Sequence, residues 1–303
     1  MPELPEVETI VRGLRKVILD KKITDFENRD SKVIKFEAKD VVGSKIEAIG
    51  RHAKIIELDL SNRKHLLIHL KMTGQLIWEE KPGTTAFGLR KARPSTSLTA
   101  GRVAGGHPSP AWVETLPNKH TRAVFHFSDN SVLFFNDLRR FGYMKLYDFS
   151  NGEDVPELKK LGPEPFSADF TSEYLISRVR KIPNRKVKQF IIDQEIISGV
   201  GNIYVDEALF YAKISPLRPV KEISLTEWKT IRESIRKALE LGIKYGGSSE
   251  DTYVDAFGNQ GKFNEHTQVY RKTGQPCPHG CGGKIERITL GGRGTHYCPD
   301  CQK

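Results

Sequence analysis

The sequence lacks any uninterrupted apolar run of 18 residues, which is about the length that a membrane-spanning helix needs. Its first residues are acidic, unlike the basic and then apolar start of a secretory signal peptide. Both absences argue against a membrane partner and against export. We therefore expect a cytoplasmic protein.

Cysteine is also scarce, with four residues in a chain of 303, all of them after position 276. In a reducing compartment such a group indicates a metal site more than disulfides. Two close pairs are separated by 16 residues, with Gly and Pro nearby, and four thiolates so spaced can close a tetrahedron around zinc. His279 is an alternative ligand. We predict a structural zinc ribbon held by Cys277, Cys281, Cys298 and Cys301.

Acidic residues are outnumbered by basic ones, 38 to 48, which gives a net charge of +10 and a pI near 9.3. This excess favours a polyanionic partner, although many basic proteins bind no nucleic acid. A hydrophobic content of 38% is compatible with buried cores. The length suffices for two domains, or for two domains and a small appendage.

The first half of the chain has the period of β-strands. Apolar side chains alternate in residues 66–70 and 124–127, and short turns separate such runs. We predict a β-sandwich or flattened barrel, within a domain of residues 1–150 that begins with a helix. Residues 81–117 interrupt the strands with a segment rich in Gly, Pro, Ser and Thr, and we expect a mobile, solvated loop there, whose basic residues are an alternative DNA contact.

The second half has the period of helices. Three short helices are expected between Tyr174 and Lys213, and Ser224 with Glu227 forms a capping box that starts a fourth. We assign residues 151–256 to a helical domain and residues 257–303 to the cysteine ribbon. The predicted fold class is α+β.

The first residues place unusual chemistry at the chain end. Removal of Met1, which is usual before a small residue, leaves the secondary amine of Pro2; a free α-amino group titrates at about 7.7 to 8.0, below lysine. Such an amine can attack an electrophilic carbon and form an imine, with Glu3 and Glu6 close enough to move protons. A simple helix start explains Pro5 and Glu6 equally well, but it leaves Pro2 and Glu3 unexplained.

The opening Pro-Glu-Leu-Pro-Glu-Val-Glu resembles the N-terminal signature of the formamidopyrimidine-DNA glycosylase (Fpg) family. The resemblance covers every predicted domain except residues 81–117, which look like an insertion, and the first cysteine pair has three intervening residues where the family usually has two. Other segments similar to family motifs follow in family order: Arg51-His52-Ala53-Lys54, His69-Leu70-Lys71-Met72-Thr73-Gly74, Asn136-Asp137-Leu138-Arg139-Arg140-Phe141-Gly142, and Ser198-Gly199-Val200-Gly201-Asn202-Ile203-Tyr204.

The resemblance implies roles for individual residues. Pro2 would be the nucleophile and Glu3 the proton donor. Lys54 matches a lysine that contacts the phosphate beside the damaged nucleotide, and Asn202 matches the phosphate-binding asparagine of a helix-two-turns-helix (H2TH) domain. Arg293 matches a ribbon arginine that binds phosphates flanking the lesion. Ordinary exposed positions remain the alternative for Lys54 and Arg293.

A second set of matches concerns the DNA duplex itself. Met72, Arg139 and Phe141 match three side chains that fill the gap left when a damaged base is turned out of the stack, a step that costs a few kcal/mol. His69 matches a phosphate-binding histidine, and Lys188 with its basic neighbours just upstream would add sequence-independent attraction to DNA. Two further positions match weakly and would also suit ordinary surface roles: His120 and Tyr270.

The resemblance therefore implies a bifunctional DNA glycosylase and abasic-site lyase that removes oxidised purines, with one structural zinc ion and damaged double-stranded DNA as partner. We expect it to work as a monomer at a bacterial-type nucleoid, with residues 253–261 near the base. Two alternatives remain. An endonuclease VIII-like enzyme for oxidised pyrimidines would typically begin Pro-Glu-Gly and lack the Arg139 and Phe141 pair. A DNA-binding zinc protein without catalysis would keep all its function when Pro2 is replaced.

Overall fold

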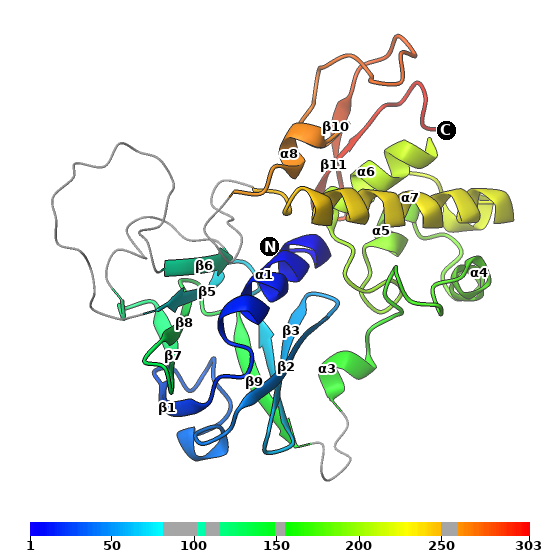
Figure 1. Ribbon diagram of the computed structural model, residues 1–303. Helices are drawn as coiled ribbons and strands as arrows, with labels where there is room; N and C mark the ends of the chain where they lie inside the picture. Colours follow the sequence, from blue (N-terminus) through cyan, green and yellow to red (C-terminus); the bar gives the residue numbers. More distant parts are fainter. Residues whose placement is uncertain (81–101, 107–115, 149–154, 250–259) are drawn as a thin grey trace, which may run out of the picture. The chain divides into compact units, whose positions relative to one another are not determined.

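The structure is a computed structural model that describes residues 1–80, 102–106, 116–148, 155–249 and 260–303 (Figure 1). Its residues group into two compact units. Unit 1 contains Met1–Pro2, Glu6–Val155 and Gly246–Gly261. Unit 2 contains Glu3–Pro5, Pro156–Tyr245 and Lys262–Lys303. The helical and ribbon regions share one unit, and the predicted domain boundaries near 150 and 256 stay a prediction.

Unit 1 contains two antiparallel sheets that share one core. The five-stranded sheet has the order β1-β7-β8-β5-β6 and the four-stranded sheet the order β2-β3-β4-β9. Inward side chains of both sheets belong to one buried cluster, so the predicted sandwich is confirmed. The strands are β1 (Ile23–Asn28), β2 (Ile46–His52), β3 (Ile55–Leu60), β4 (Lys64–His69), β5 (Gly74–Glu79), β6 (Arg102–Gly106), β7 (Thr121–Phe127), β8 (Val132–Asp137) and β9 (Tyr143–Asp148), with a short 3-10 helix η1 at Ala38–Asp40.

Helix α1 (Leu4–Val17) packs on this sandwich through one face. Val7, Ile10, Val11 and Leu14 recur at helical spacing and are buried in the same cluster as the strands. Arg15 and Lys16 lie in the last turn, where cations complement the helix dipole. The predicted apolar stripe is therefore confirmed.

The expectation of a loop throughout residues 81–117 is wrong at Arg102–Gly106, which form β6. This strand pairs along the edge of β5, from Gln75 with Gly106 to Glu79 with Arg102. Backbone pairing to an available sheet edge needs no apolar alternation, so the sequence period gave no signal. Residues 81–101 and 107–115 lie outside the described part, so the expected mobility of the loop concerns residues that the structure does not describe.

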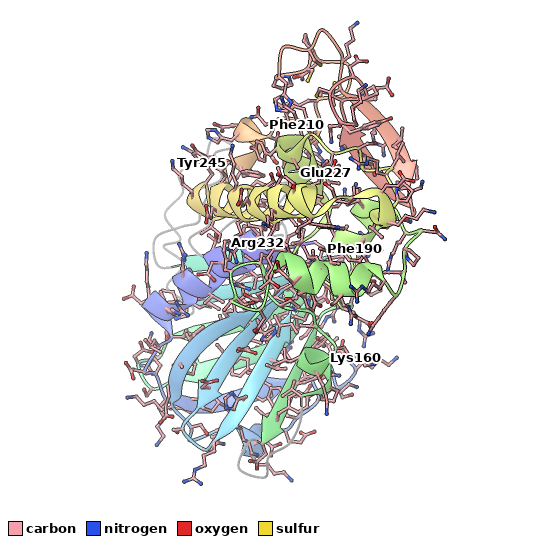
Figure 2. All side chains as sticks on the ribbon, turned by 90° about the vertical axis from the view of Figure 1, so that its right-hand side faces the viewer. Lys160, Phe190, Phe210, Glu227, Arg232 and Tyr245 are labelled. Carbon is pink, nitrogen blue, oxygen red and sulfur yellow. The ribbon has the colours of Figure 1, made fainter. Side chains whose placement is uncertain are left out.

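Unit 2 contains a helical core built around α6 and α7. The backbone N–H of Glu227 donates to the Ser224 hydroxyl, and the Glu227 carboxylate accepts from the backbone N–H of Ser224. The predicted capping box is therefore confirmed. Phe190 lies in the core shared by the helices, and Phe210 lies at the end of α6 that packs on the ribbon (Figure 2). The helices are α3 (Pro156–Lys159), α4 (Ser172–Val179), α5 (Val187–Ile191), α6 (Asn202–Ala212), the 3-10 helix η3 (Val220–Glu222), α7 (Leu225–Lys244) and α8 (Phe263–His266).

The C-terminal part of unit 2 is a two-stranded hairpin, β10 (Glu286–Leu290) and β11 (Arg293–Tyr297). Leu290 pairs with Arg293, so Gly291 and Gly292 form a two-residue turn with φ values of 58° and 75°. A tight turn with positive φ at both central residues favours glycine. Arg293 is therefore presented, exposed, beside the tip of the hairpin.

No helix in the described part of the chain combines the length and apolar character needed to cross a membrane.

Candidate functional site

The N-terminal residues are held in buried positions. Pro2 is buried, and the side chains of Glu3 and Glu6 belong to residues that are only 5% and 3% exposed. Leu4 N donates to Gly199 O at 3.1 Å, which fixes the chain end against the loop before α6. An acidic pair at a chain terminus would normally be solvated, because burial of a carboxylate is costly without hydrogen-bond donors.

Glu3 meets its donors at the start of α6. The amide of Ile203, in the first turn of this helix, donates to Glu3 Oε1 at 3.2 Å. The helix N-terminus carries a partial positive charge and amides without helical partners, so it stabilises a carboxylate there. Gly201 precedes the helix, and a Cβ atom on it would lie only 2.0 Å from the Glu3 carboxyl carbon. The glycine is therefore required by this close approach.

Glu6 has a different partner. Its Oε1 accepts a hydrogen bond from Ser248 N at 2.7 Å. Ser248 follows α7 and precedes residues 250–259, which lie outside the described part of the chain, as does most of the predicted base-reading segment 253–261. Glu6 thus fixes the backbone at Ser248, a contact that no local sequence pattern predicts.

Lys54 lies in the turn between β2 and β3 and is only 6% exposed. Arg51 fixes this turn, since its Nη1 donates to Ala53 O at 3.0 Å and its Nε pairs with Glu8 Oε2 at 3.0 Å. Ala53 has a φ of 54°, which is uncommon for a residue other than glycine. The backbone that carries the Lys54 side chain is therefore held in one conformation.

His69 is a buried, neutral imidazole at the end of β4. Burial, and then the charges of Lys71 and Lys54, lower the pKa of His69 to about 3. Lys71 N donates to His69 Nδ1 at 3.0 Å, which leaves the proton on Nε2. The Nε2–H group could donate a hydrogen bond to a phosphate oxygen.

Three predicted insertion residues project from two turns of unit 1. Met72 and Phe141 are 43% and 53% exposed, unusual values for large apolar side chains. Leu138, which the sequence reasoning passed over, is 39% exposed in the second turn. The guanidinium of Arg139 lies 4.7 Å from the centre of the Phe141 ring. Arg139 and Phe141 thus form one cationic and aromatic pair in the second turn, and Arg139 N donates to Thr73 Oγ1 of the first turn at 3.0 Å.

His120 and Tyr270, the two weaker matches, lie beside these groups in their own units. Asp137 N donates to His120 O at 2.9 Å, directly before the second turn. Burial, followed by Lys119 and Arg122, lowers the pKa of His120. The ring of Tyr270 lies edge-on to the His296 ring of the hairpin, with 4.9 Å between the two ring centres. The DNA-binding role of both residues stays a prediction.

Asn202 contacts the hairpin that carries Arg293. Its Nδ2 donates to Gly294 O at 3.1 Å, and Lys188 Nζ donates to the same oxygen at 3.0 Å and to Thr295 Oγ1 at 2.8 Å. Lys188 also pairs with Asp206 Oδ1 at 2.7 Å. Asn202 is therefore hydrogen-bonded to the residue that directly follows Arg293.

Lys188 itself is buried, so the expected attraction of DNA stays a prediction for its basic neighbours upstream. The residue is 1% exposed and forms a buried ion pair with Asp206, whose other oxygen accepts from His296 N at 2.9 Å. Burial lowers the pKa of Lys188 and Asp206 opposes that shift. A basic run in the sequence does not show which of its members faces the core.

Glu207, the neighbour of Asp206, holds the segment that leads into the ribbon. This fully buried carboxylate accepts from the amides of Gln268, Val269 and Tyr270 at 2.8, 3.0 and 2.9 Å. Burial raises the pKa of Glu207 although these amides lower it. Helix α6 is thus hydrogen-bonded both to the hairpin and to the segment of chain that precedes the ribbon.

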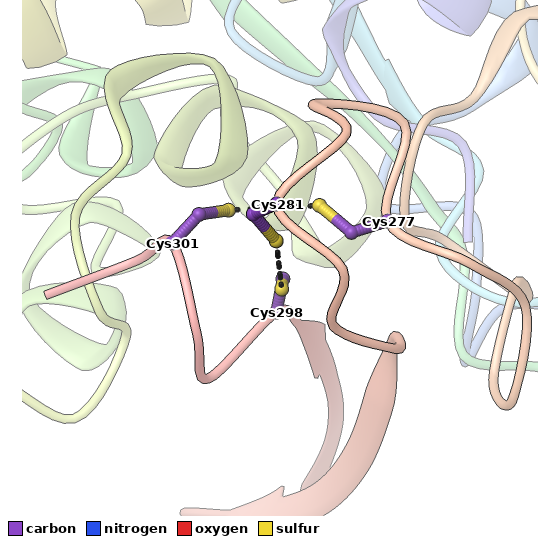
Figure 3. A group of neighbouring side chains, drawn as sticks. All are labelled: Cys277, Cys281, Cys298 and Cys301. Carbon is purple, nitrogen blue, oxygen red and sulfur yellow. Dashed lines mark hydrogen bonds between the residues drawn. The ribbon is translucent and has the colours of Figure 1, made fainter.

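The four predicted cysteines converge in one group (Figure 3). Their sulfur atoms all lie within 4.8 Å of one another, and two pairs are 3.6 Å apart, Cys277 with Cys301 and Cys281 with Cys298. Tetrahedral zinc–thiolate bonds of about 2.3 Å place sulfurs about 3.8 Å apart, so these residues fit one zinc ion. Four protein ligands would leave no open position for catalysis.

His279, the alternative ligand, lies outside this tetrahedron. Its Nδ1 is 3.4 Å from Cys301 Sγ, and its ring stacks on Phe210 at 4.0 Å. Within the described residues, the only His, Cys, Asp and Glu group close enough to hold a metal is the four-cysteine cluster. The histidine is placed to contact a ligand sulfur, not to replace it.

Three sequence models match successive parts of the chain. They are described as the formamidopyrimidine-DNA glycosylase N-terminal domain (residues 1–144), the formamidopyrimidine-DNA glycosylase H2TH domain (residues 161–254) and a zinc finger found in FPG and IleRS (residues 274–303). The third match agrees with the cysteine cluster and suggests a structural zinc ion.

Whole-chain relatives carry the same description. Formamidopyrimidine-DNA glycosylase of Streptococcus pneumoniae serotype 4 is 36% identical over 100% of this chain and 99% of its own, and that of Exiguobacterium is 37% identical over 100% of both. Two solved structures of Lactococcus lactis Fpg, each covered completely, are 31% identical: a mutant with Fapy-dG containing DNA, TM-score 0.81, and a complex with abasic site containing DNA, TM-score 0.80.

Proposed function

Because the chain belongs to the formamidopyrimidine-DNA glycosylase family, and so to the DNA glycosylases of repair, we propose that it excises oxidised purines and then cleaves the abasic site. The substrates would be 8-oxoguanine and formamidopyrimidines, opposite cytosine, in double-stranded DNA. The observation that carries this proposal is the buried Glu3 carboxylate at the N-terminus of α6, joined covalently to Pro2.

The reaction begins at the Pro2 amine once Met1 has been removed. The nitrogen lone pair attacks C1′ of the turned-out nucleotide, and the bond from C1′ to the base breaks. The base leaves with the bonding electron pair and takes up the proton that the Pro2 nitrogen loses. Glu3 protonates the sugar ring oxygen, so the ring opens and an iminium links Pro2 to C1′. Glu6, held by Ser248 N, keeps the chain end in place.

The lyase steps follow from the same linkage. The iminium acidifies the C2′ proton, and its loss expels the 3′ phosphate by β-elimination. A second elimination, of the δ type, expels the 5′ phosphate, and water then hydrolyses the imine to release Pro2. Lys54 and His69 would bind phosphates beside the lesion, and Asn202 and Arg293 would bind others, with His120 and Tyr270 at the margins.

Zinc would play no part in these steps. One ion bound by the four cysteines would hold the ribbon that carries Arg293. We also propose that the protein acts as a monomer, since a single chain carries every residue that the mechanism uses.

Borohydride trapping tests the function. Protein is incubated with duplexes that contain 8-oxoguanine or thymine glycol, with borohydride present to reduce the imine. We expect a covalent adduct with 8-oxoguanine that has the mass of a chain beginning at Pro2. An adduct only with thymine glycol would support an endonuclease VIII-like enzyme, and no adduct with either would support a non-catalytic DNA-binding protein.

Two variants control this assay. Pro2→Gly should react more slowly, because it replaces the secondary amine by a primary one. Protein with an N-terminal extension that blocks the amine should bind DNA but form no adduct. Full cleavage by a chain that retains Met1 would contradict the mechanism.

A further inference from the structure

We propose that Asp137 is a positioning residue that joins two turns of unit 1, so that Met72, Arg139 and Phe141 enter the duplex together. The inference rests on the proposed function, in which these three side chains fill the gap beside a turned-out nucleotide. Asp137 would not itself touch DNA.

The Asp137 carboxylate is buried at the C-terminal end of β8 and accepts hydrogen bonds from both turns. Asp137 is 0% exposed to solvent. Oδ1 accepts from the Thr73 hydroxyl in the first turn and from Arg139 N, at 3.2 Å, in the second. Oδ2 accepts from Gly142 N at 2.7 Å, which closes the second turn around the carboxylate. One carboxylate therefore binds both turns that project the insertion residues.

Thr73 adds a second connection between the turns. Its hydroxyl donates to Asp137 and accepts from Arg139 N at 3.0 Å. Thr73 directly follows Met72, so the hydroxyl couples the backbone at Met72 to the backbone at Arg139. The position of one insertion residue is thus linked to that of another, 67 residues away in the sequence.

The carboxylate is itself fixed to the sheet. Asp137 pairs with Gly74 at the end of β5 and β8, and its carbonyl oxygen accepts from Arg122 Nε and Nη2 at 2.9 and 2.8 Å. Gly142 approaches so closely that a Cβ atom there would lie 2.9 Å from His69 O and 3.0 Å from Asp137 Oδ2. The two turns therefore have little freedom to move apart.

This arrangement has a physical advantage for base extrusion. Unstacking a base costs a few kcal/mol. Side chains that enter the gap together replace more of the lost stacking contacts than one of them alone. A displacement of about 1 Å in a positioning contact can cost roughly 10²-fold in rate. Uncoupled turns would still bind the DNA backbone but would fill the gap less effectively.

The test uses fluorescence of 2-aminopurine placed next to a stable abasic analogue in a duplex. This base brightens when it is unstacked, and no chemistry is needed for the signal. Thr73→Val removes the bridging hydroxyl at nearly constant size, and Thr73→Ser restores it. Thr24→Val is the matched control, because the exposed Thr24 hydroxyl donates to His126 O at 3.2 Å and contacts neither of the two turns.

We expect Thr73→Val to lose most of the fluorescence increase at saturating protein. It should also slow excision of 8-oxoguanine by about tenfold, less than the roughly 10²-fold cost of a 1 Å misplacement, because the bonds from Asp137 to the second turn remain. The apparent affinity for the duplex and the melting temperature should stay near those of Thr24→Val. Thr73→Ser should restore the signal. Asp137→Asn, which presents an amide hydrogen to donors, should show the same defect.

Normal fluorescence and excision in Thr73→Val and Asp137→Asn would overturn the inference. So would a signal lost only in proportion to unfolding, since that marks a merely structural role. The proposed function fails separately: if wild-type protein excises no 8-oxoguanine yet Thr73→Val still abolishes the fluorescence increase, the positioning role stands and the substrate assignment does not.

Discussion

Gly201→Ala offers a direct test of Glu3 as the proton donor. A Cβ atom at this position would lie 2.0 Å from the Glu3 carboxyl carbon and 2.3 and 2.4 Å from its two oxygens. Cβ atoms essentially never approach heavy atoms within 3.0 Å, so one of the two groups must shift. Gly201 belongs to the backbone that leads into α6, so the Glu3 side chain is the freer of the two.

The size of the effect follows from this geometry. Restoring a 3.0 Å separation moves the carboxylate by about 1 Å and breaks its 3.2 Å hydrogen bond from Ile203 N. A misplacement of about 1 Å costs roughly 10²-fold in rate, which corresponds to about 2.7 kcal/mol of activation free energy. DNA affinity should change much less, because Glu3 is proposed to act on a proton and not on a phosphate.

The assay is single-turnover excision of 8-oxoguanine with protein in excess. Gly50→Ala is the matched control, since its Cβ would meet Glu57 at an ordinary 3.6 Å. The double variant with Glu3→Gln should be no slower than Glu3→Gln alone, because both changes act on the same carboxylate. A wild-type rate for Gly201→Ala, or additive losses in the double variant, would refute the reasoning.

Three further predictions concern unit 2. Lys188→Met should lower the free energy of unfolding by about 3–5 kcal/mol because it leaves Asp206 buried without its cation; denaturant titration beside the exposed control Lys181→Met checks this, and equal losses would contradict it. The two hydrogen bonds from the Arg218 guanidinium lower the pKa of Glu227 to about 2, below its ordinary 4.5. The contribution of the ionised Glu227 to folding stability is therefore fully present above pH 4.5 and is lost as the pH falls through 2. Glu227→Gln should therefore destabilise by about 1–2 kcal/mol at pH 7, a value reduced for solvent screening, and by little near pH 2; a constant difference across that range would be the contrary result. Metal analysis should find one zinc per chain, retained in His279→Ala and lost in Cys281→Ala, and loss in the histidine variant would make it a ligand.

Much of the architecture could be predicted from local patterns. The apolar stripe of α1, the strands around Leu66 and Phe125 and the capping box at Ser224 were each specified by residues close together in the sequence. The same holds for the cysteine ribbon, because two close pairs on tight turns need only one hairpin to bring them together. The strand β6 escaped prediction because its pairing uses backbone groups at an edge and requires no side-chain period.

The candidate site was predicted less completely. Motif similarity supplied Pro2, Glu3 and the matched DNA-binding residues, whose roles remain proposals. It gave no partner for any of them. Sequence reasoning also grouped Lys188 with neighbouring basic residues that would attract DNA, and the structure shows Lys188 buried with Asp206.

The sequence by itself determined which residue types recur, at which period, and therefore which segments fold as helices, strands and ribbon. Only the tertiary structure decided that Asp137 meets Thr73, that Glu3 faces the start of α6 and that Lys188 lies beneath the Arg293 hairpin. The physical reason is that a local pattern fixes which face of an element is apolar, whereas the hydrogen-bond partner of a buried polar group depends on where distant segments of the chain come to lie.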